Sequence, residues 1–131
     1  MIGLDTNVLI RIAIEDDLAQ SMRAQKRLAA LTVADPGFVS LIVLVELWWV
    51  LTRTYGKTSM YVSDFVEHLT QIATLVVQEQ EQVLIALATV RTNNADFADA
   101  LIVASSQSHG CIAVETFDQN AIKKAGMTPL G

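Results

Sequence analysis

The sequence predicts an α/β fold, with a mainly parallel sheet of four to five strands between two layers of helices. Short apolar segments alternate with longer segments of helical periodicity, a pattern typical of parallel strands joined by helical crossovers. Of the 131 residues, 52% are hydrophobic and 18% are charged, which indicates a folded core rather than disorder. Because this length suits one domain, we expect a single three-layer α/β/α sandwich over residues 1–131.

The strands are predicted from four short apolar segments, which cover residues 1–5, 38–39, 73–77 and 111–115. Helices are predicted from segments with apolar residues at helical spacing, which cover residues 8–13, 17–32, 41–55, 59–71, 79–91, 97–109 and 119–125. Asp35-Pro36-Gly37 is a typical turn before the second strand. Ser40 is a typical N-cap, and Gly56 is a typical helix end.

Composition excludes several classes of protein. Cys111 is the only cysteine, so no intrachain disulfide is expected and a cytoplasmic protein is the simplest interpretation. The longest apolar run, Leu41 to Leu51, contains Glu46 and is shorter than the ~18–20 residues that a membrane span requires. Met1 leads directly into an apolar segment, without the basic region of a secretory signal. The sequence also contains no glycine-rich phosphate loop and no Cys/His metal spacing.

The net charge of −5 is accounted for by five acidic residues that we place in one cluster: Asp5, Glu46, Asp96, Asp99 and Asp118. Without them, nine of the 14 acidic residues remain against nine basic residues. Bound divalent cations would cancel most of the charge of such a cluster. The acidic composition therefore does not exclude a polyanionic substrate.

Asp5 and Asp118 each follow a predicted strand and precede a predicted helix. In open α/β sheets, ligands and chemistry gather beyond the carboxyl ends of the strands. Aspartate is also a common helix N-cap, and Asn7 is open to the same interpretation. Taken alone, the position of each aspartate is explained equally well by a structural cap and by a functional carboxylate.

Glu46 lies in a predicted helix that is apolar around its whole circumference. We expect its carboxylate to be partly buried, which is costly unless it is paired, hydrogen-bonded or bound to a metal. The alternative is a buried ion pair, for example with Arg11.

Asp96 and Asp99 stand at the start of the helix predicted over residues 97–109. Their spacing of three residues places both on one helix face, close enough to repel. Capping of the helix explains Asp96, whereas Asp99 is expected to face inward with Ile102 and Val103. A cation held by both aspartates would remove the repulsion.

Together, these carboxylates predict a site for a divalent cation. Oxygen ligands without histidine or cysteine favour magnesium or manganese over zinc. Such a cation can activate water and neutralise charge on a phosphoryl group, so hydrolysis of a phosphodiester is the expected reaction. His68 is interpreted instead as a surface residue and Cys111 as a core residue.

Four segments carry a resemblance to PIN-domain ribonucleases, specifically to the VapC-type toxins of bacterial and archaeal toxin–antitoxin pairs. The segments are Leu4–Leu9 (LDTNVL), Val43–Leu51 (VLVELWWVL), Asp96–Ile102 (DFADALI) and Thr116–Asp118 (TFD). In their order and spacing, they span nearly the whole chain. The resemblance implies a Rossmann-like sandwich whose acidic residues bind Mg²⁺ or Mn²⁺.

Carried over by position, the resemblance implies a catalytic and metal-binding quartet of Asp5, Glu46, Asp99 and Asp118. Supporting hydrogen bonds to ligands or water would come from Thr6, Asn7 and Thr116, and Asp96 matches a frequent extra acidic position. The implied reaction is endonucleolytic cleavage of RNA, with a metal-activated water as the nucleophile.

The resemblance also implies partners, because VapC-type proteins typically form homodimers and are neutralised by a small VapB-type antitoxin. The apolar surplus of the chain, including one of Trp48 and Trp49, is compatible with such partners. The candidates for contact with the RNA substrate are Arg11, Arg23, Lys26 and Arg27.

Two other functions remain open. An aspartyl-nucleophile phosphatase also has an aspartate after its first strand, but Asn7 stands where that chemistry usually has a second carboxylate. A non-catalytic interaction module would use the acidic cluster for a structural metal or for arginines of a partner. In that module, Asp99→Asn would change the melting temperature substantially with no activity to lose.

Overall fold

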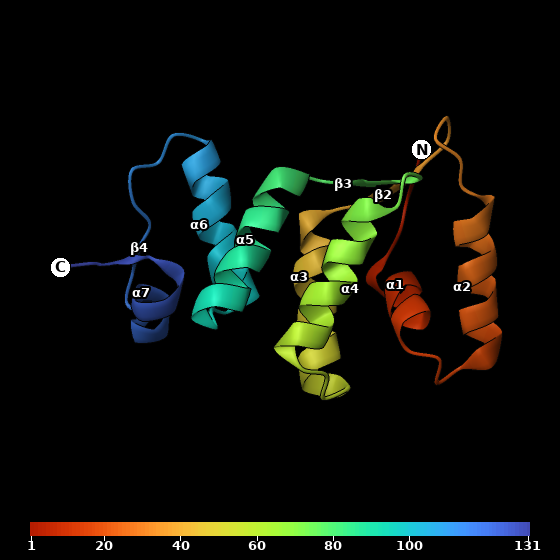
Figure 1. The fold of residues 1–131 in the computed structure, drawn as a ribbon, viewed down its shortest axis with the longest axis horizontal. Coiled ribbons are helices and arrows are strands. Elements are labelled where there is room, and N and C mark those ends of the chain that lie inside the picture. Colours follow the sequence, from red (N-terminus) through yellow and green to blue (C-terminus); the bar gives the residue numbers. More distant parts are fainter. The chain divides into compact units, whose positions relative to one another are not determined.

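The computed structural model describes residues 1–131, which form two compact units (Figure 1). Unit 1 is Met1–Gln78 and unit 2 is Glu79–Gly131. The predicted class, α/β with parallel strands, is confirmed. The predicted sheet of four to five strands is wrong in number, because the larger sheet has three strands. None of the helices combines the length and the apolar character needed to cross a membrane. A single domain over residues 1–131 stays a prediction.

Unit 1 alternates strands with helices. Its elements are β1 (Ile2–Gly3), α1 (Thr6–Ala13), α2 (Leu18–Ala30), β2 (Gly37–Val39), α3 (Leu41–Trp49), the π-helix η1 (Val50–Thr54), α4 (Ser59–Gln71) and β3 (Leu75–Val77). The helix predicted over residues 41–55 is thus α3 continued by η1. Within η1 the hydrogen bonds span five residues, as from the Tyr55 N–H to the Val50 carbonyl at 3.2 Å.

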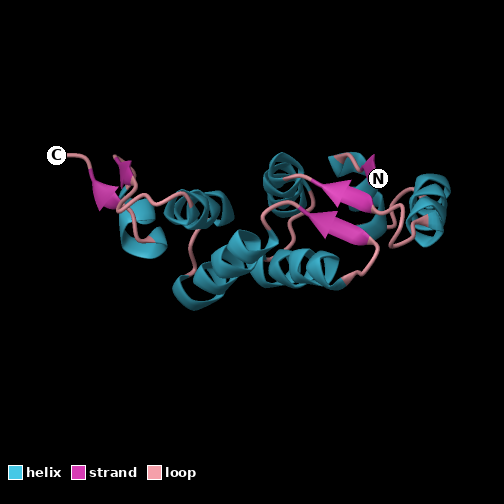
Figure 2. Ribbon diagram, turned by 90° about the horizontal axis from the view of Figure 1, so that it is seen from above, coloured by secondary structure: helices cyan, strands magenta, loops and turns pink.

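The three strands of unit 1 form a parallel sheet in the order β1-β2-β3, and Figure 2 shows neighbouring strands pointing the same way. Beyond β1, the Leu4 N–H still donates to the Phe38 carbonyl at 2.9 Å. In β3, Val77 is buried while its neighbour Val76 is 43% exposed, so one sheet face is covered within unit 1. Asp5 follows directly after this last sheet hydrogen bond.

The core of unit 1 forms where α1, α3 and α4 turn their apolar sides inward. Its fully buried apolar side chains are Leu9, Val39, Leu44, Leu47, Leu51, Val62, Val66 and Leu69. Burying each contributes roughly 1.5–3 kcal/mol relative to exposure. Because α1 and α3 both pack into this core, the residues at their facing sides are held in fixed positions.

Unit 2 contains three helices and one pair of strands: α5 (Gln80–Asn93), α6 (Phe97–Ser108), β4 (Glu115–Thr116), α7 (Gln119–Ala125) and β5 (Thr128–Pro129). Its fully buried apolar side chains are Val83, Ala86, Leu87 and Phe97, and Ala121 of α7 is 1% exposed. The two short strands pair in parallel in a separate two-stranded sheet.

The strand predicted over residues 111–115 is wrong for most of its length. Gly110 adopts a left-handed conformation, with φ of +87°, and ends α6. The Cys111 N–H then turns back to the Ser106 carbonyl at 3.1 Å, so it is used by the helix end and not by a strand. Cys111 is exposed, which also contradicts its interpretation as a core residue. The strand β4 begins only at Glu115.

Candidate metal centre

Asp5 lies between β1 and α1, at the N-cap position of the helix. Its side chain accepts no capping hydrogen bond, and the residue is exposed. The positive end of the helix dipole favours a carboxylate there even without a direct bond. The interpretation of Asp5 as a structural cap is therefore not supported, and its carboxylate is free to bind a ligand.

Thr6 links the start of α1 to Glu46 in the middle of α3. Its side chain is buried, with 3% of its surface exposed, and its hydroxyl donates a hydrogen bond to Glu46 Oε1. This bond joins residues that are 40 positions apart in the chain. It fixes one carboxylate oxygen of Glu46 beside the residue that follows Asp5.

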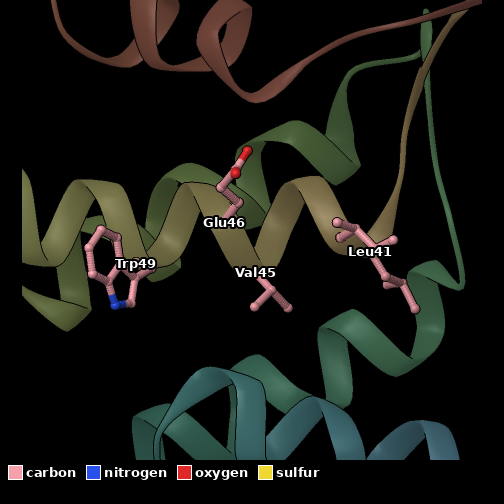
Figure 3. Close-up of a pocket in the computed structure, with 5 residues that line it drawn as sticks. Leu41, Val45, Glu46 and Trp49 are labelled. Carbon is pink, nitrogen blue, oxygen red and sulfur yellow. The ribbon is translucent and has the colours of Figure 1, made fainter.

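Glu46 itself is exposed, so the expectation of a partly buried carboxylate is wrong. The helix α3 is apolar on all sides but buries only Leu44 and Leu47 completely. Figure 3 shows Glu46 projecting from the opposite side of α3 to Val45. The alternative of an ion pair with Arg11 is also excluded, because Arg11 pairs with Asp16.

Thr6→Val should weaken the binding of Mg²⁺ by about tenfold, because it removes the hydroxyl that orients Glu46 while keeping the buried shape. Partners that orient metal ligands typically contribute a 10- to 100-fold effect on affinity. Titration calorimetry with Mg²⁺ measures the change. Thr6→Ser keeps the hydroxyl and is the matched control, expected to bind as the unaltered protein does. Equal affinities for Thr6→Val and Thr6→Ser would contradict this role.

In unit 2, Asp118 is the N-cap of α7 and does act as a cap. Its Oδ1 accepts hydrogen bonds from the backbone N–H groups of Asn120 at 2.8 Å and Ala121 at 3.1 Å. The Thr116 hydroxyl oxygen in turn accepts from the Asp118 N–H at 3.1 Å. Both bonds to the side chain use the same oxygen, so the carboxylate is oriented by the helix while Oδ2 takes no part in the cap.

Asp96 and Asp99 stand at the start of α6 as predicted, and Asp96 caps the helix by accepting from the Asp99 N–H at 3.0 Å. Asp99 is half-buried. Burial raises the pKa of its carboxyl, and the negative charges of Asp96 and Asp118 raise that pKa further. Three carboxylates therefore share one region of unit 2 and repel one another, a situation that a bound cation would relieve.

Each unit brings part of the predicted set together. Unit 1 joins Thr6 to Glu46 at the start of α1, where Asp5 and Asn7 flank Thr6, and unit 2 gathers Asp96, Asp99 and Asp118. Within either unit, no three acidic, histidine or cysteine side chains are placed to hold a metal ion. A quartet of Asp5, Glu46, Asp99 and Asp118 around one cation stays a prediction.

Comparison with known proteins places the chain in a family. The model of the PIN domain matches residues 2–127, which spans residues of both units. Among solved structures, the crystal structure of VapC20 from Mycobacterium tuberculosis, a Sarcin-Ricin loop cleaving toxin, is similar. It shares 18% sequence identity and a TM-score of 0.46, over 99% of this chain and 98% of that chain. No curated protein matches the sequence significantly. Because the family model covers nearly all 131 residues, this chain belongs to the PIN domain family.

Proposed function

We propose that this protein is a metal-dependent endoribonuclease of the VapC toxin type, which hydrolyses RNA phosphodiester bonds. The observation that carries the proposal is at the start of α1. There the Asp5 carboxylate is not used as a cap, and the hydroxyl of the next residue, the buried Thr6, donates a hydrogen bond to Glu46. Neither Asp5 nor Glu46 forms an ion pair with a basic side chain, so both carboxylates are available to a divalent cation. Membership of the PIN domain family supports the same function.

The donor atoms of the proposed site fit Mg²⁺ or Mn²⁺. Asp5, Glu46, Asp99 and Asp118 offer only carboxylate oxygens, which are the ligands that these hard cations prefer. Burial raises the pKa of the Asp99 carboxyl, and the negative charges of Asp96 and Asp118 raise it further, so a bound cation would favour the charged form of Asp99. When bound, a divalent cation lowers the pKa of water and offsets negative charge on a phosphoryl group.

The protein's own contribution is to orient two of these carboxylates, those of Glu46 and Asp118. Thr6 fixes Glu46 from within the core of unit 1, and the first N–H groups of α7 fix Asp118. Thr116 holds the turn before Asp118. Asn7 is exposed in the first turn of α1, where its amide can hydrogen-bond to a ligand or to water. Orientation by such bonds is what keeps metal ligands in place before the metal arrives.

We further propose that the protein acts in the cytoplasm as a homodimer and is inhibited by a VapB-type antitoxin. Its exposed apolar side chains support an interaction with other chains: Trp49 is 59% exposed and Ile42 is 81% exposed on α3. Of the two tryptophans, Trp49 is thus the one at the surface.

The alternative is the non-catalytic interaction module, and Asp99→Asn distinguishes the two. In the nuclease, removing the repelled charge should raise the melting temperature of the metal-free protein at pH 7 by roughly 1–2 °C, from a like-charge repulsion of about 0.2–0.5 kcal/mol. The pKa of Asp99 is raised in the folded state, so its stabilising contribution is present at low pH, where it is protonated. That contribution is lost as the pH rises through its folded pKa. The gain from Asp99→Asn should therefore vanish below about pH 3.8, the usual Asp value.

The same variant should lose cleavage of a structured RNA. The unaltered protein should cleave it with Mg²⁺ or Mn²⁺, stop when EDTA is added and recover when the cation is restored in excess. Glu115→Gln, at an exposed acidic residue of β4, is the control and should remain active. A large fall in melting temperature for Asp99→Asn, together with no cleavage by the unaltered protein, would establish the interaction module instead.

A further inference from the structure

A cavity of about 310 Å³ lies between α1 and α2, entirely within unit 1. Its lining residues are Asn7, Val8, Arg11, Gln20, Arg23, Ala24 and Arg27. Three of the nine basic residues of the chain therefore meet at one hollow, on a protein whose net charge is −5. Lys26, which lies on α2 with Arg23 and Arg27, does not line the cavity.

Of the three arginines that line this cavity, two form no ion pair with an acidic side chain. Arg23 and Arg27 are both exposed and stand one turn apart on α2, a spacing at which like charges repel. Arg11 lines the cavity from α1 and has side-chain partners of its own. It pairs with Asp16, and its Nε donates to the Gln20 side chain at 2.7 Å.

The acidic groups around the cavity are largely engaged elsewhere. Asp35 is paired with the N-terminal amino group at 2.6 Å, which lowers the pKa of its carboxyl more than Arg27 does. Asp17 caps α2 by accepting from the Gln20 N–H at 3.0 Å. Glu15 accepts from the Gln25 side chain at 3.2 Å. The charges of Arg23 and Arg27 are thus left for an anion from outside the chain.

The cavity begins beside the proposed metal centre. Asn7 lines it and directly follows Thr6, the residue that holds Glu46. Arg11 stands one helical turn beyond Asn7, about 6 Å farther along α1. A chain of phosphates that enters at Asp5 and continues along α1 would therefore pass over the cavity.

We propose that this cavity binds a backbone phosphate of the RNA substrate, next to the phosphodiester that is cleaved. The inference rests on the proposed nuclease function and assigns it a second subsite. Arginine suits phosphate because its planar guanidinium donates two parallel hydrogen bonds to the phosphate oxygens. The guanidinium groups of Arg23 and Arg27, one turn apart on α2, can bind the same phosphate. The Asn7 amide can donate to the same phosphate from α1.

Binding of a fluorescein-labelled single-stranded RNA tests the cavity without cleavage. The protein carries Asp5→Asn throughout, and fluorescence anisotropy in Mg²⁺ gives the dissociation constant at several salt concentrations. Arg23→Gln with Arg27→Gln should weaken binding at least tenfold. It should also lower the slope of log affinity against log salt by about 0.7 for each phosphate that the protein no longer neutralises. The control is Lys123→Gln with Lys124→Gln, in the last turn of α7, which removes the same charge away from the cavity and should change binding little.

A second measurement separates this inference from the nuclease proposal. In the otherwise unaltered protein, the double arginine variant should raise KM for RNA. It should leave unchanged the hydrolysis of bis(4-nitrophenyl) phosphate, which has one phosphodiester and no neighbouring phosphate. Equal RNA affinities and salt slopes for the arginine variant and the lysine control would overturn the cavity as a phosphate site. The arginines would then be assigned to binding an acidic segment of a protein partner. If the unaltered protein binds RNA through these arginines but cleaves neither substrate, the cavity stands and the nuclease proposal fails.

Discussion

Asp5→Asn is expected to reduce RNA cleavage by roughly 100-fold or more while leaving the fold intact. The loss is expected because the proposed metal centre would lose one of its four charged ligands. The fold is unaffected because the Asp5 side chain makes no capping hydrogen bond, and asparagine is as good an N-cap as aspartate. Initial rates on a labelled RNA, measured at saturating Mg²⁺, give the size of the loss, and circular dichroism gives the melting temperature.

The control for this prediction is Asp17→Asn, the same chemical change at the N-cap of α2. Asp17 does accept a capping hydrogen bond, at 3.0 Å from the Gln20 N–H, and asparagine can replace it there. This control should keep both activity and stability. Full activity in the Asp5 variant would remove Asp5 from the metal centre and with it the main support for the proposed nuclease.

Gly37→Val is expected to destabilise the protein by about 1–3 kcal/mol, the usual cost of overpacking a filled core. A Cβ atom at Gly37 would lie 2.9 Å from side-chain carbons of Leu31 and Leu75 and 3.1 Å from one of Leu4. All three leucines are themselves buried, so they cannot all move aside. Urea denaturation at constant pH measures the change in the free energy of unfolding.

A double-mutant cycle with Leu75→Ala checks the cause. Leu75→Ala alone should be destabilising because it leaves a cavity, but beside valine at position 37 it provides the missing space. The two changes together should cost clearly less than their sum. If the two losses of unfolding free energy simply add, the clash between residue 37 and Leu75 is not the cause of the destabilisation.

Helices with regular apolar spacing and a clear end were predictable from sequence. The segment predicted over residues 59–71 is α4 and that over residues 119–125 is α7, with the same bounds. The strand β5 was missed because Thr128–Pro129 has two residues and no apolar run. The strand predicted at residues 111–115 failed because Gly110 directs the next N–H back to α6. An apolar run carries no information on such a helix ending.

Within the candidate site, the sequence identified the acidic residues but not the hydrogen bonds that each of them makes. Asp5 and Asp118 occupy the same pattern of strand, aspartate and helix, yet only Asp118 caps its helix. The N-cap backbone does not explain the difference, because Ser40 and Thr58 accept capping bonds at ψ of 160° and 156°, close to the 159° of Asp5. The difference therefore lies in the side chain, on which the local sequence pattern carries no information. The bond from Thr6 to Glu46 joins two distant segments, so no local pattern could predict it.

That buried hydroxyl also gives a spectroscopic probe of the site. Thr6 is 3% exposed, so its hydroxyl proton is shielded from exchange with water, and its methyl group lies in a fixed environment. A ¹³C-labelled threonine methyl at this position should give a narrow resonance whose chemical shift responds when Glu46 takes up a ligand. Binding of a cation at the proposed metal centre would then be followed in the free protein, with no RNA present and no turnover.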